Sequence, residues 1–223
     1  MYDEPIASRS MMERGTVLHE VRLDHVLHRI RASGARRVLD LGCGSGQLLH
    51  RLAIEEQFEE IVGLESSPMA LMEARQLLAS HPQAPFPRVT LLNGSYTEPQ
   101  PSLQGYDAAA MVETIEHIKP ELLSAVERVV FAQMRPGVIF MTTPNREYNP
   151  LFDLRPGEFR EADHKFEWDR ARFGQWARGV AWRNGYRVVM GGVGEEDPEF
   201  GAPTQTAYFS LQVPSRTIHS RIG

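Results

Sequence analysis

The chain has 223 residues, of which 42% are hydrophobic and 24% are charged, and its formal net charge is −5. This length can bury one sizeable core but not two full-sized ones, so we expect a single domain over residues 1–223. The apolar stretches are strand-length, far shorter than the roughly 20 residues of a membrane-spanning helix, which excludes an integral membrane protein of that kind. The negative charge excludes the strongly basic field used to bind long nucleic acids, although gripping a few terminal nucleotides needs only a local basic strip.

The N-terminus and the cysteine content indicate a cellular compartment. Residues 1–14 mix charged and small side chains and lack the apolar core of a secretory signal, so we expect a flexible tail there. The single cysteine, Cys43, cannot form an internal disulfide, which is typical of a reducing compartment. The sequence therefore predicts a cytoplasmic protein.

Strand and helix patterns alternate along most of the chain. Leu23, Val26 and Ile30 share one helical face and Gly34 follows as a stop signal, so a helix precedes the first strand. The expected elements after it are a strand at 37–41, a helix at 47–57, a strand at 61–65, a helix at 68–79, strands at 89–92 and 107–112, a helix at 115–133, a strand at 137–142, a helix around 173–184, and strands at 187–190 and 206–212. This order predicts a mostly parallel, seven-stranded sheet with helices on both faces, a Rossmann-like α/β fold.

One segment, 143–168, interrupts the alternation. It contains Pro144, Pro150, Pro156 and Gly157 and follows neither the helical nor the strand period. An irregular loop of this length in a compact domain is usually either functional or disordered.

Three glycines occupy the junction between the first strand and the next helix. Residues 40–46 read Asp-Leu-Gly-Cys-Gly-Ser-Gly. Glycines let the backbone turn tightly and approach a ligand, and the following helix N-terminus offers free N–H groups. The third glycine follows the second by two residues, whereas the dinucleotide-binding fingerprint requires three. A tight turn that binds nothing would look similar, so the loop alone leaves both interpretations open.

A carboxylate downstream favours a cofactor site. Glu65 ends the second strand, about 20 residues after the loop, where folds of this kind place an acidic side chain on ribose hydroxyls. The loop resembles the D/E-x-G-x-G-x-G signature of class I methyltransferases, which implies S-adenosylmethionine as the cofactor. The cofactor-binding residues are then Asp40, Gly42, Cys43, Gly44, Gly46, Glu65 and Ser66. We take Cys43 as a small loop residue and not as a nucleophile, since nothing near it in the sequence would activate the thiol.

A second polar group follows the fourth strand. Glu113, Glu116 and His117 are spaced so that they share one face if the chain turns into a helix there. Ligands of open α/β sheets lie outside the carboxyl ends of the strands, which favours a divalent metal site. A helix start with acidic residues near its positive end explains the same pattern equally well.

Two strings in the long loop decide between these interpretations. Residues 142–149 read Thr-Thr-Pro-Asn-Arg-Glu-Tyr-Asn, and residues 163–168 read Asp-His-Lys-Phe-Glu-Trp. Together with Glu113-x-x-Glu116-His117 they resemble the Hen-type small-RNA 3′-terminal ribose 2′-O-methyltransferases, over roughly residues 38–209. The resemblance implies four metal ligands, which are Glu113, Glu116, His117 and His164. Bacterial relatives often carry a histidine where this chain has Glu161, a departure that leaves the four ligands intact.

The resemblance also implies the reaction, a metal-dependent transfer of the methyl group of S-adenosylmethionine to the 2′-hydroxyl of the 3′-terminal nucleotide of RNA. A bound metal would lower the pKa of that hydroxyl, and His117 or His164 would be the candidate catalytic base. Because imidazole ligands suit manganese or cobalt better than magnesium, we expect manganese or cobalt to be preferred.

The expected partner is the 3′ end of a small or cleaved RNA, together with an RNA-repair or small-RNA-processing protein, and neither DNA nor a membrane. Arg146, Arg155, Arg160 and Lys165 are candidate phosphate contacts, although a solvated loop would carry such residues too. We expect Phe166 and Trp168 to anchor the loop on the core, in preference to stacking on bases.

Two other classes of protein were weighed. Small-molecule O-methyltransferases similar to those of quinone biosynthesis can also show an E-x-x-E-H element, but they lack the two loop strings. A binding module that has lost catalysis should show a broken glycine loop or missing ligands, and both are intact here. Methylation of an amine is not favoured, because no Asn/Asp-Pro-Pro-Tyr element follows the fourth strand.

Overall fold

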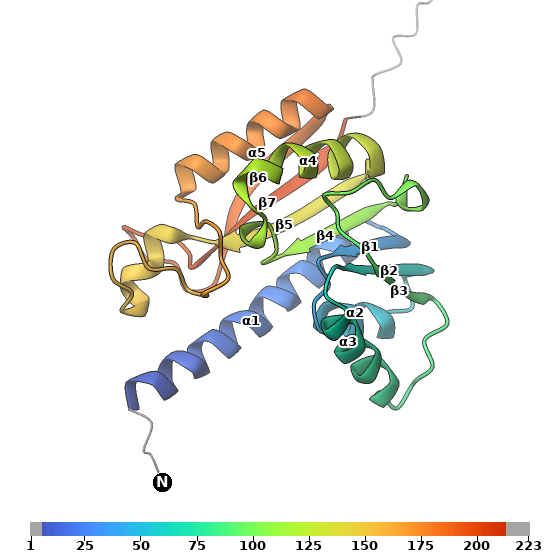
Figure 1. The fold of residues 1–223 in the computed structure, drawn as a ribbon, viewed down its shortest axis with the longest axis horizontal. Coiled ribbons are helices and arrows are strands. Elements are labelled where there is room, and N and C mark those ends of the chain that lie inside the picture. Colours follow the sequence, from blue (N-terminus) through green and yellow to red (C-terminus); the bar gives the residue numbers. More distant parts are fainter. Residues whose placement is uncertain (1–5, 213–223) are drawn as a thin grey trace, which may run out of the picture.

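The computed structural model describes the backbone of residues 6–212 and the side chains of residues 15–212. Seven strands form one sheet in the order β3-β2-β1-β4-β5-β7-β6 (Figure 1). The five strands from β3 to β5 are parallel, and β7 runs antiparallel to both of its neighbours. The strands are Arg37–Leu41 (β1), Glu60–Glu65 (β2), Val89–Asn93 (β3), Ala108–Val112 (β4), Val138–Pro144 (β5), Tyr186–Val193 (β6) and Thr204–Leu211 (β7). The predicted fold class is confirmed.

Helices cover both faces of the sheet. On one face lie α1 (Ile6–Ala32), α2 (Gln47–Ile54) and α3 (Pro68–Ser80), and on the other lie α4 (Leu123–Val126), the π-helix η4 (Glu127–Met134) and α5 (Arg170–Asn184) (Figure 1). Four short 3-10 helices complete the described elements, which are η1 (Pro101–Leu103), η2 (Ile115–His117), η3 (Pro120–Leu122) and η5 (Arg146–Phe152). Among residues 6–212, the structure contains no helix with the length and apolar character needed to cross a membrane.

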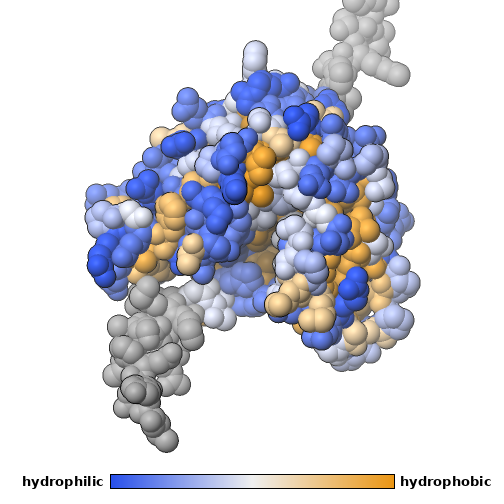
Figure 2. Space-filling view, viewed as in Figure 1, coloured by the Kyte–Doolittle hydropathy of each residue, from blue (hydrophilic) through white to orange (hydrophobic). Residues whose placement is uncertain are grey.

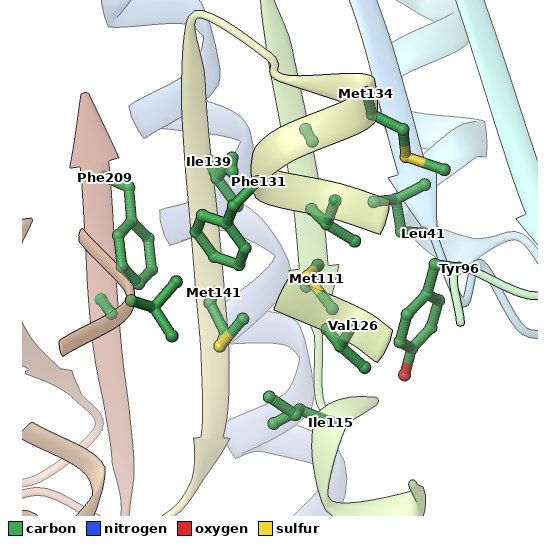
Figure 3. Close-up of a cluster of buried hydrophobic side chains, with 14 of the residues drawn as sticks. Leu41, Tyr96, Met111, Ile115, Val126, Phe131, Met134, Ile139, Met141 and Phe209 are labelled. Carbon is green, nitrogen blue, oxygen red and sulfur yellow. The ribbon is translucent and has the colours of Figure 1, made fainter. Parts of the chain in front are cut away.

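Each face of the sheet has its own hydrophobic core. Between the sheet and α4, η4 and α5, Phe131 packs edge-on against Phe209 with ring centroids 4.9 Å apart, beside Met141 (Figure 3). On the other face, Val26 and Ile30 of α1 pack with β1 and β5. These side chains are almost fully removed from water, and burial of that kind is the main stabilising contribution to folding.

Two sequence-based expectations about helices were wrong. No helix start was predicted within residues 1–14, where a flexible tail was expected, but α1 begins at Ile6, and residues 1–5 lie outside the described part of the chain. The single helix predicted for residues 115–133 is divided into η2, η3, α4 and η4. The division has a local cause, because Pro120 forces Lys119 into extended backbone and so prevents a continuous helix.

The helix predicted after the long loop is confirmed as α5. Its first turn is capped by Asp169, whose side chain accepts a hydrogen bond from the N–H of Arg172 at 2.7 Å. Its last turn ends at Gly185, which adopts a left-handed conformation with φ of 73°. The loop between β5 and α5 is therefore held between two well-defined elements.

Candidate active site

The glycine loop, residues 42–46, turns sharply between β1 and α2. Gly42, Gly44 and Gly46 have φ angles of 77°, 52° and 85°, a region that residues with a Cβ rarely adopt. Close packing also requires glycine at position 42, because a Cβ there would lie 2.2 Å from Oγ1 of Thr114. The loop is therefore held against the segment that follows β4.

Glu65, at the end of β2, faces this loop. Its Oε2 atom accepts a hydrogen bond from the N–H of Gly44 at 3.0 Å, and its Oε1 atom accepts one from the N–H of Ser67 at 2.8 Å. A cavity of about 350 Å³ adjoins both the loop and Glu65, a volume that suits one small molecule. The predicted cofactor residues that line it are Gly42, Gly44, Glu65 and Ser66.

The other three predicted cofactor residues, Asp40 of β1 and Cys43 and Gly46 of the loop, do not line the cavity. Asp40 is 2% exposed and its Oδ2 atom has no hydrogen-bond partner, and burial, together with the charge of Glu65, raises the pKa of Asp40 to about 7. Burial also raises the pKa of the Cys43 thiol, which agrees with a packing role. Gly46 lies against α3, where a Cβ would come within 2.8 Å of the Cβ of Ala74. These three residues contribute to the packing around the loop and not to the lining of the cavity.

Sequence reasoning missed the far wall of the cavity, which Ser95 and Tyr96 contribute just after β3. The hydroxyl of Tyr96 donates to the carbonyl oxygen of Thr114 at 3.0 Å and so ties the two segments together. Parallel strands end at the same edge of a sheet, and this rule could have found both residues from their place after the third strand.

Glu116, His117 and His164 approach one another at the carboxyl edge of the sheet. One ligand atom from each lies within 4.8 Å of the other two, and we call these three residues the triad. Glu116 and His117 belong to η2, whereas His164 belongs to the loop between β5 and α5. The N–H of Lys165 donates to the carbonyl oxygen of Glu116 at 2.8 Å and joins the two segments. One carboxylate and two imidazoles form a set that suits a divalent transition metal.

The carboxylate of Glu116 fits a cation. The residue is fully buried, its Oε2 atom accepts a hydrogen bond from the hydroxyl of Thr143 at 2.9 Å, and its Oε1 atom has no partner. Burial, followed by the negative charge of Glu113, raises the pKa of Glu116 well above its usual value. A buried oxygen without a donor costs free energy unless a ligand satisfies it, and a metal ion would do so.

Each histidine of the triad has a carboxylate partner at its Nδ1 atom. His164 Nδ1 lies 2.7 Å from Oε1 of Glu167, and His117 Nδ1 lies 2.9 Å from Oδ2 of Asp163. A carboxylate accepts, so each Nδ1 carries a proton, and in the neutral imidazole Nε2 then has a lone pair for a metal. Glu167 and Asp163 were not predicted as site residues, although both stand in the string that contains His164.

The two carboxylate partners differ in their surroundings. The side chain of Glu167 is fully buried, and Asn149 and the N–H of Arg160 also donate to it, at 2.5 and 2.7 Å. Burial alone would raise the pKa of Glu167, but the hydrogen bonds from His164, Asn149 and the N–H of Arg160, with the charge of Arg160, together lower the pKa. The side chain of Asp163 is 70% exposed. His164 is thus held inside the protein, whereas His117 is held at its surface.

The fourth predicted ligand, Glu113, lies apart from the triad. Its Oε1 atom accepts a hydrogen bond from Thr142 at 2.8 Å, and its Oε2 atom forms an ion pair with Arg22 of α1 at 3.2 Å. The convergence predicted for a helix does not occur, because Glu113 precedes η2 and has a left-handed φ of 48°. The structure therefore brings together three of the four predicted ligands.

Arg160 is half-buried, and its guanidinium is engaged by oxygen atoms of the long loop and of the segment before β7. Its guanidinium donates to the carbonyl oxygens of Pro203 and Asn145 at 2.8 and 2.6 Å, and to Oδ1 of Asn149 at 2.8 Å. The other three candidates for phosphate contacts, Arg146, Arg155 and Lys165, are exposed, and Arg155 forms an ion pair with Glu158.

Phe166 and Trp168 anchor the loop, as predicted. Both are buried, at 8% and 5% exposed, and their rings stack with centroids 4.3 Å apart. Trp168 also contacts Phe173 and Trp176 of α5. These rings belong to the core on the α5 face of the sheet, so they fix the loop in place.

A cleft of about 850 Å³ lies between α1 and the long loop, and we call it the α1–loop cleft. Its lining residues include His19 and Arg22 from α1, Phe152 and Leu154 from the loop, and His164. In the space-filling view the surface is hollowed between the lobe that contains the loop and the lobe that contains α2 and α3 (Figure 2). Glu113 and His117 line both this cleft and the cofactor cavity, so the two spaces meet at the triad.

The strand order, the glycine loop and Glu65 together define the class I methyltransferase fold. In agreement, residues 39–140 match the family described as a methyltransferase domain. The small RNA 2′-O-methyltransferase of Xenopus tropicalis is 35% identical over 202 residues, which are 86% of this chain and 54% of that protein. The protein of the same name from Arabidopsis thaliana is 31% identical over 89% of this chain and 23% of its own length.

One solved structure matches this chain over its own full length. The methyltransferase domain of bacterial CtHen1-C is 39% identical, with a TM-score of 0.79, over 88% of this chain and 100% of that domain. The chain therefore belongs to the family of Hen1 methyltransferase domains. It spans about half the length of the Xenopus relative, 54%.

Proposed function

We propose that the protein transfers the methyl group of S-adenosylmethionine to the 2′-hydroxyl of the 3′-terminal nucleotide of RNA, with a divalent metal at the triad. The observation that carries the proposal is that the cofactor cavity and the α1–loop cleft meet at Glu113 and His117. A donor in the cavity and an acceptor in the cleft would then face each other across the triad. The second support is that the relatives from Xenopus tropicalis and Arabidopsis thaliana are small RNA 2′-O-methyltransferases.

Different residues would bind the methyl donor and the metal. The glycine loop and Glu65 would hold the methyl donor. Glu116, His117 and His164 would hold a divalent metal, which when bound supplies the Lewis acidity that lowers the pKa of a ribose hydroxyl. Glu167 and Asp163 accept hydrogen bonds from the Nδ1 atoms of His164 and His117. Each histidine would therefore bind the shared metal through Nε2. A histidine that binds the metal with Nε2 has no lone pair left, so metal ligand and general base are alternative roles for it.

The donor test is a titration. S-adenosylhomocysteine should raise the thermal midpoint of the protein in a saturable way, because a ligand that binds only the folded state stabilises that state. NAD should leave the midpoint unchanged. Calorimetry that detects neither the donor nor its product would remove the cofactor assignment.

The activity test uses labelled S-adenosylmethionine, short RNAs and a series of metals, with the methyl group located by nuclease digestion and mass spectrometry. Manganese or cobalt should activate more than magnesium at equal concentration, because two of the three triad ligands are imidazoles. RNAs that end in 3′-phosphate or 3′-deoxyribose should be inactive, since only a terminal ribose offers two free neighbouring hydroxyls. Full activity in excess chelator, or methyl groups at internal riboses, would contradict the proposal.

A small-molecule O-methyltransferase is the alternative, and the same assay with a phenolic acceptor tests it. We further expect the reaction to take place in the cytoplasm on small or cleaved RNA, with an RNA-repair or small-RNA-processing protein as a partner. The single cysteine, Cys43, supports the compartment.

A further inference from the structure

The outer side of α5 carries two exposed arginines and an exposed tryptophan. Arg172, Arg178 and Trp182 face solvent, on the side of the helix away from the hydrophobic core, and we call these three residues the α5 surface. Trp182 is 84% exposed, whereas the other two tryptophans, Trp168 and Trp176, pack against the core. A single exposed apolar side chain needs no explanation, but an indole beside arginines is the combination that binds single-stranded nucleic acid.

The side chains of the α5 surface follow one another along the helix. Trp182 stands one turn after Arg178, and helical side chains lean back toward the N-terminus, so the indole is directed toward the turn that carries Arg178. A Cβ at Gly174 would lie 3.0 Å from both terminal nitrogens of the Arg178 guanidinium, so glycine leaves room for the guanidinium to lie along the helix. The guanidinium of Arg172 lies 6.0 Å from the ring centre of Trp168, at the start of the helix. From Arg172 to Trp182 the helix extends about 15 Å.

Four cations on this side of the molecule have no ion-pair partner among residues 15–212. They are all exposed, and they are Lys119, Lys165, Arg172 and Arg178. Two carboxylates of the same segment are already engaged, because Asp163 lies 2.9 Å from Nδ1 of His117, and Asp169 accepts from the N–H of Arg172. The four cations are therefore available to the phosphates of a nucleic acid.

These cations lead from the triad to the α5 surface. Lys119 follows His117 by two residues, and Lys165 follows His164 directly, so both lysines stand beside the triad. The long loop then continues into α5, which runs from the loop toward the opposite edge of the sheet (Figure 1). An RNA whose terminal ribose lies at the triad can therefore continue along the α5 surface.

We propose that the α5 surface binds the upstream nucleotides of a single-stranded RNA whose 3′ end lies at the triad. The inference rests on the proposed function. One base would stack on Trp182, and phosphates nearer the 3′ end would contact Arg172 and Arg178. Stacking tolerates any sequence because every base has a π-face, and a guanidinium donates to a phosphate through two parallel N–H groups. About four stacked nucleotides span the distance from Arg172 to Trp182, so only an RNA longer than this reaches the indole.

The first experiment measures RNA binding by fluorescence anisotropy, with manganese and S-adenosylhomocysteine present so that no turnover occurs. Two single-stranded RNAs share the same 3′ end and have about four and about sixteen nucleotides. Trp182→Ala should weaken binding of the longer RNA about fivefold or more, the range of one stacked base, and leave binding of the shorter RNA unchanged. Trp182→Phe retains an aromatic ring and should keep most of the affinity for the longer RNA.

Arg178→Gln should weaken binding of the longer RNA and also make it less dependent on salt. The slope of the logarithm of affinity against the logarithm of salt concentration should become shallower by about 0.7, the value for one phosphate contact on a single strand. The matched controls are Arg75→Gln and Met72→Ala, which remove an exposed cation and an exposed apolar side chain from α3, on the other face of the sheet. Both controls should bind the two RNAs as the unsubstituted protein does. Equal effects of Arg75→Gln and Arg178→Gln would overturn the inference, because overall charge would then explain the binding.

The second experiment follows the stacking through tryptophan fluorescence. Iodide should quench the emission of the exposed Trp182 in the free protein, and the longer RNA should protect it, whereas Trp182→Phe should lack both responses. A longer RNA with abasic sites upstream of its 3′ end keeps its phosphates, so it should lose the effect of Trp182→Ala and retain the effect of Arg178→Gln. Protection of Trp182 from iodide in the free protein would overturn the inference, because another surface would then cover the indole.

The remaining outcomes separate the α5 surface from other partners and from the proposed function. Polyglutamate that displaces the longer RNA, and that Trp182→Ala weakens equally, would overturn the inference and indicate an acidic protein as the partner. If the α5 variants bind the longer RNA as tightly as the unsubstituted protein, and that protein methylates both RNAs, the α5 surface is overturned and the proposed function stands. An unsubstituted protein that methylates no RNA with any metal would overturn the proposed function itself.

Discussion

The glycine loop and the long loop build the two halves of the candidate site in different ways. The glycine loop is local, because its shape follows from three positive φ angles and from a carboxylate at the end of the neighbouring strand. The long loop depends on contacts far apart in the sequence, such as Arg160 with Pro203 and Gln205 with Trp168. A cofactor site of the first kind follows from a short motif, whereas a metal site of the second kind needs the whole fold.

The largest expected effect is a loss of turnover that leaves donor binding unchanged, which would show that the two halves of the site have different functions. His164→Ala removes one of the proposed metal ligands without touching the glycine loop, so metal-dependent turnover should fall by orders of magnitude, since metal polarisation is worth several kcal/mol. Binding of S-adenosylhomocysteine should stay nearly unchanged, as calorimetry would measure. An active His164→Ala protein would show that the triad is not the reaction centre.

The next effect concerns Asp40, a buried residue of β1 two positions before the glycine loop, and depends on pH. The pKa of Asp40 is raised from 3.8 to about 7 in the folded protein. Between these pH values the folded state keeps the proton and the unfolded state releases it, so the free energy of unfolding falls as pH rises, by up to about 4 kcal/mol. The Asp40→Asn variant should keep its free energy of unfolding over this range, because an amide does not titrate.

Urea denaturation of both proteins across the pH range measures the effect. The gain in the free energy of unfolding that Asp40→Asn gives over the unsubstituted protein should be absent below about pH 4. It should grow as the pH rises and level off above about pH 7. A difference between the two proteins that does not change with pH would mean that Asp40 is not protonated in the fold.

The same contrast explains what could be predicted from the sequence. The strands, the glycine loop and Glu65 follow from short-range patterns, and the structure places Gly42, Gly44, Glu65 and Ser66 around one cavity as expected. The four predicted ligands included His164 because a family resemblance supplied it, and no spacing rule connects His164 to Glu116.

The parts that were missed have physical causes. Glu113 was expected on one helical face with Glu116, but its left-handed backbone places it before η2, and Arg22 provides a competing partner for the carboxylate. Arg160 was a candidate phosphate contact, yet its guanidinium donates to the carbonyl oxygens of Asn145 and Pro203, because buried carbonyl oxygens need donors. Neither pairing joins neighbours in sequence, so neither could be read from local patterns.

A third prediction tests how tightly the glycine loop is packed. Gly42→Ala would place a Cβ 2.2 Å from Oγ1 of Thr114, in addition to the left-handed strain of about 1–2 kcal/mol. We expect a loss of roughly 2–4 kcal/mol of stability in urea denaturation, together with loss of S-adenosylhomocysteine binding. Gly44→Ala is the control, because it has a positive φ but no atom within 4 Å of the new Cβ. Equal losses in both variants would mean that backbone strain, and not packing against Thr114, sets the requirement.

The last prediction compares the two histidines of the triad through their carboxylate partners. Glu167 is buried and holds His164, whereas Asp163 is exposed and holds His117. Replacing an orienting carboxylate typically lowers metal affinity by about 10–100-fold, so Glu167→Gln should fall in this range. Asp163→Asn should cost only a few-fold, because water and salt screen an exposed pair.

Manganese affinity, followed by electron paramagnetic resonance, measures both variants, and the visible spectrum of bound cobalt reports the arrangement of the ligands. Asn149→Ala separates orientation from loop structure, because it removes a neighbour of Glu167 but leaves the contact between Glu167 and His164. If Glu167 orients His164, Asn149→Ala should keep most of the affinity and the cobalt spectrum, while Glu167→Gln changes both. If Asn149→Ala and Glu167→Gln lower the affinity equally and leave the spectrum unchanged, Glu167 acts by holding the loop together and not by orienting the ligand.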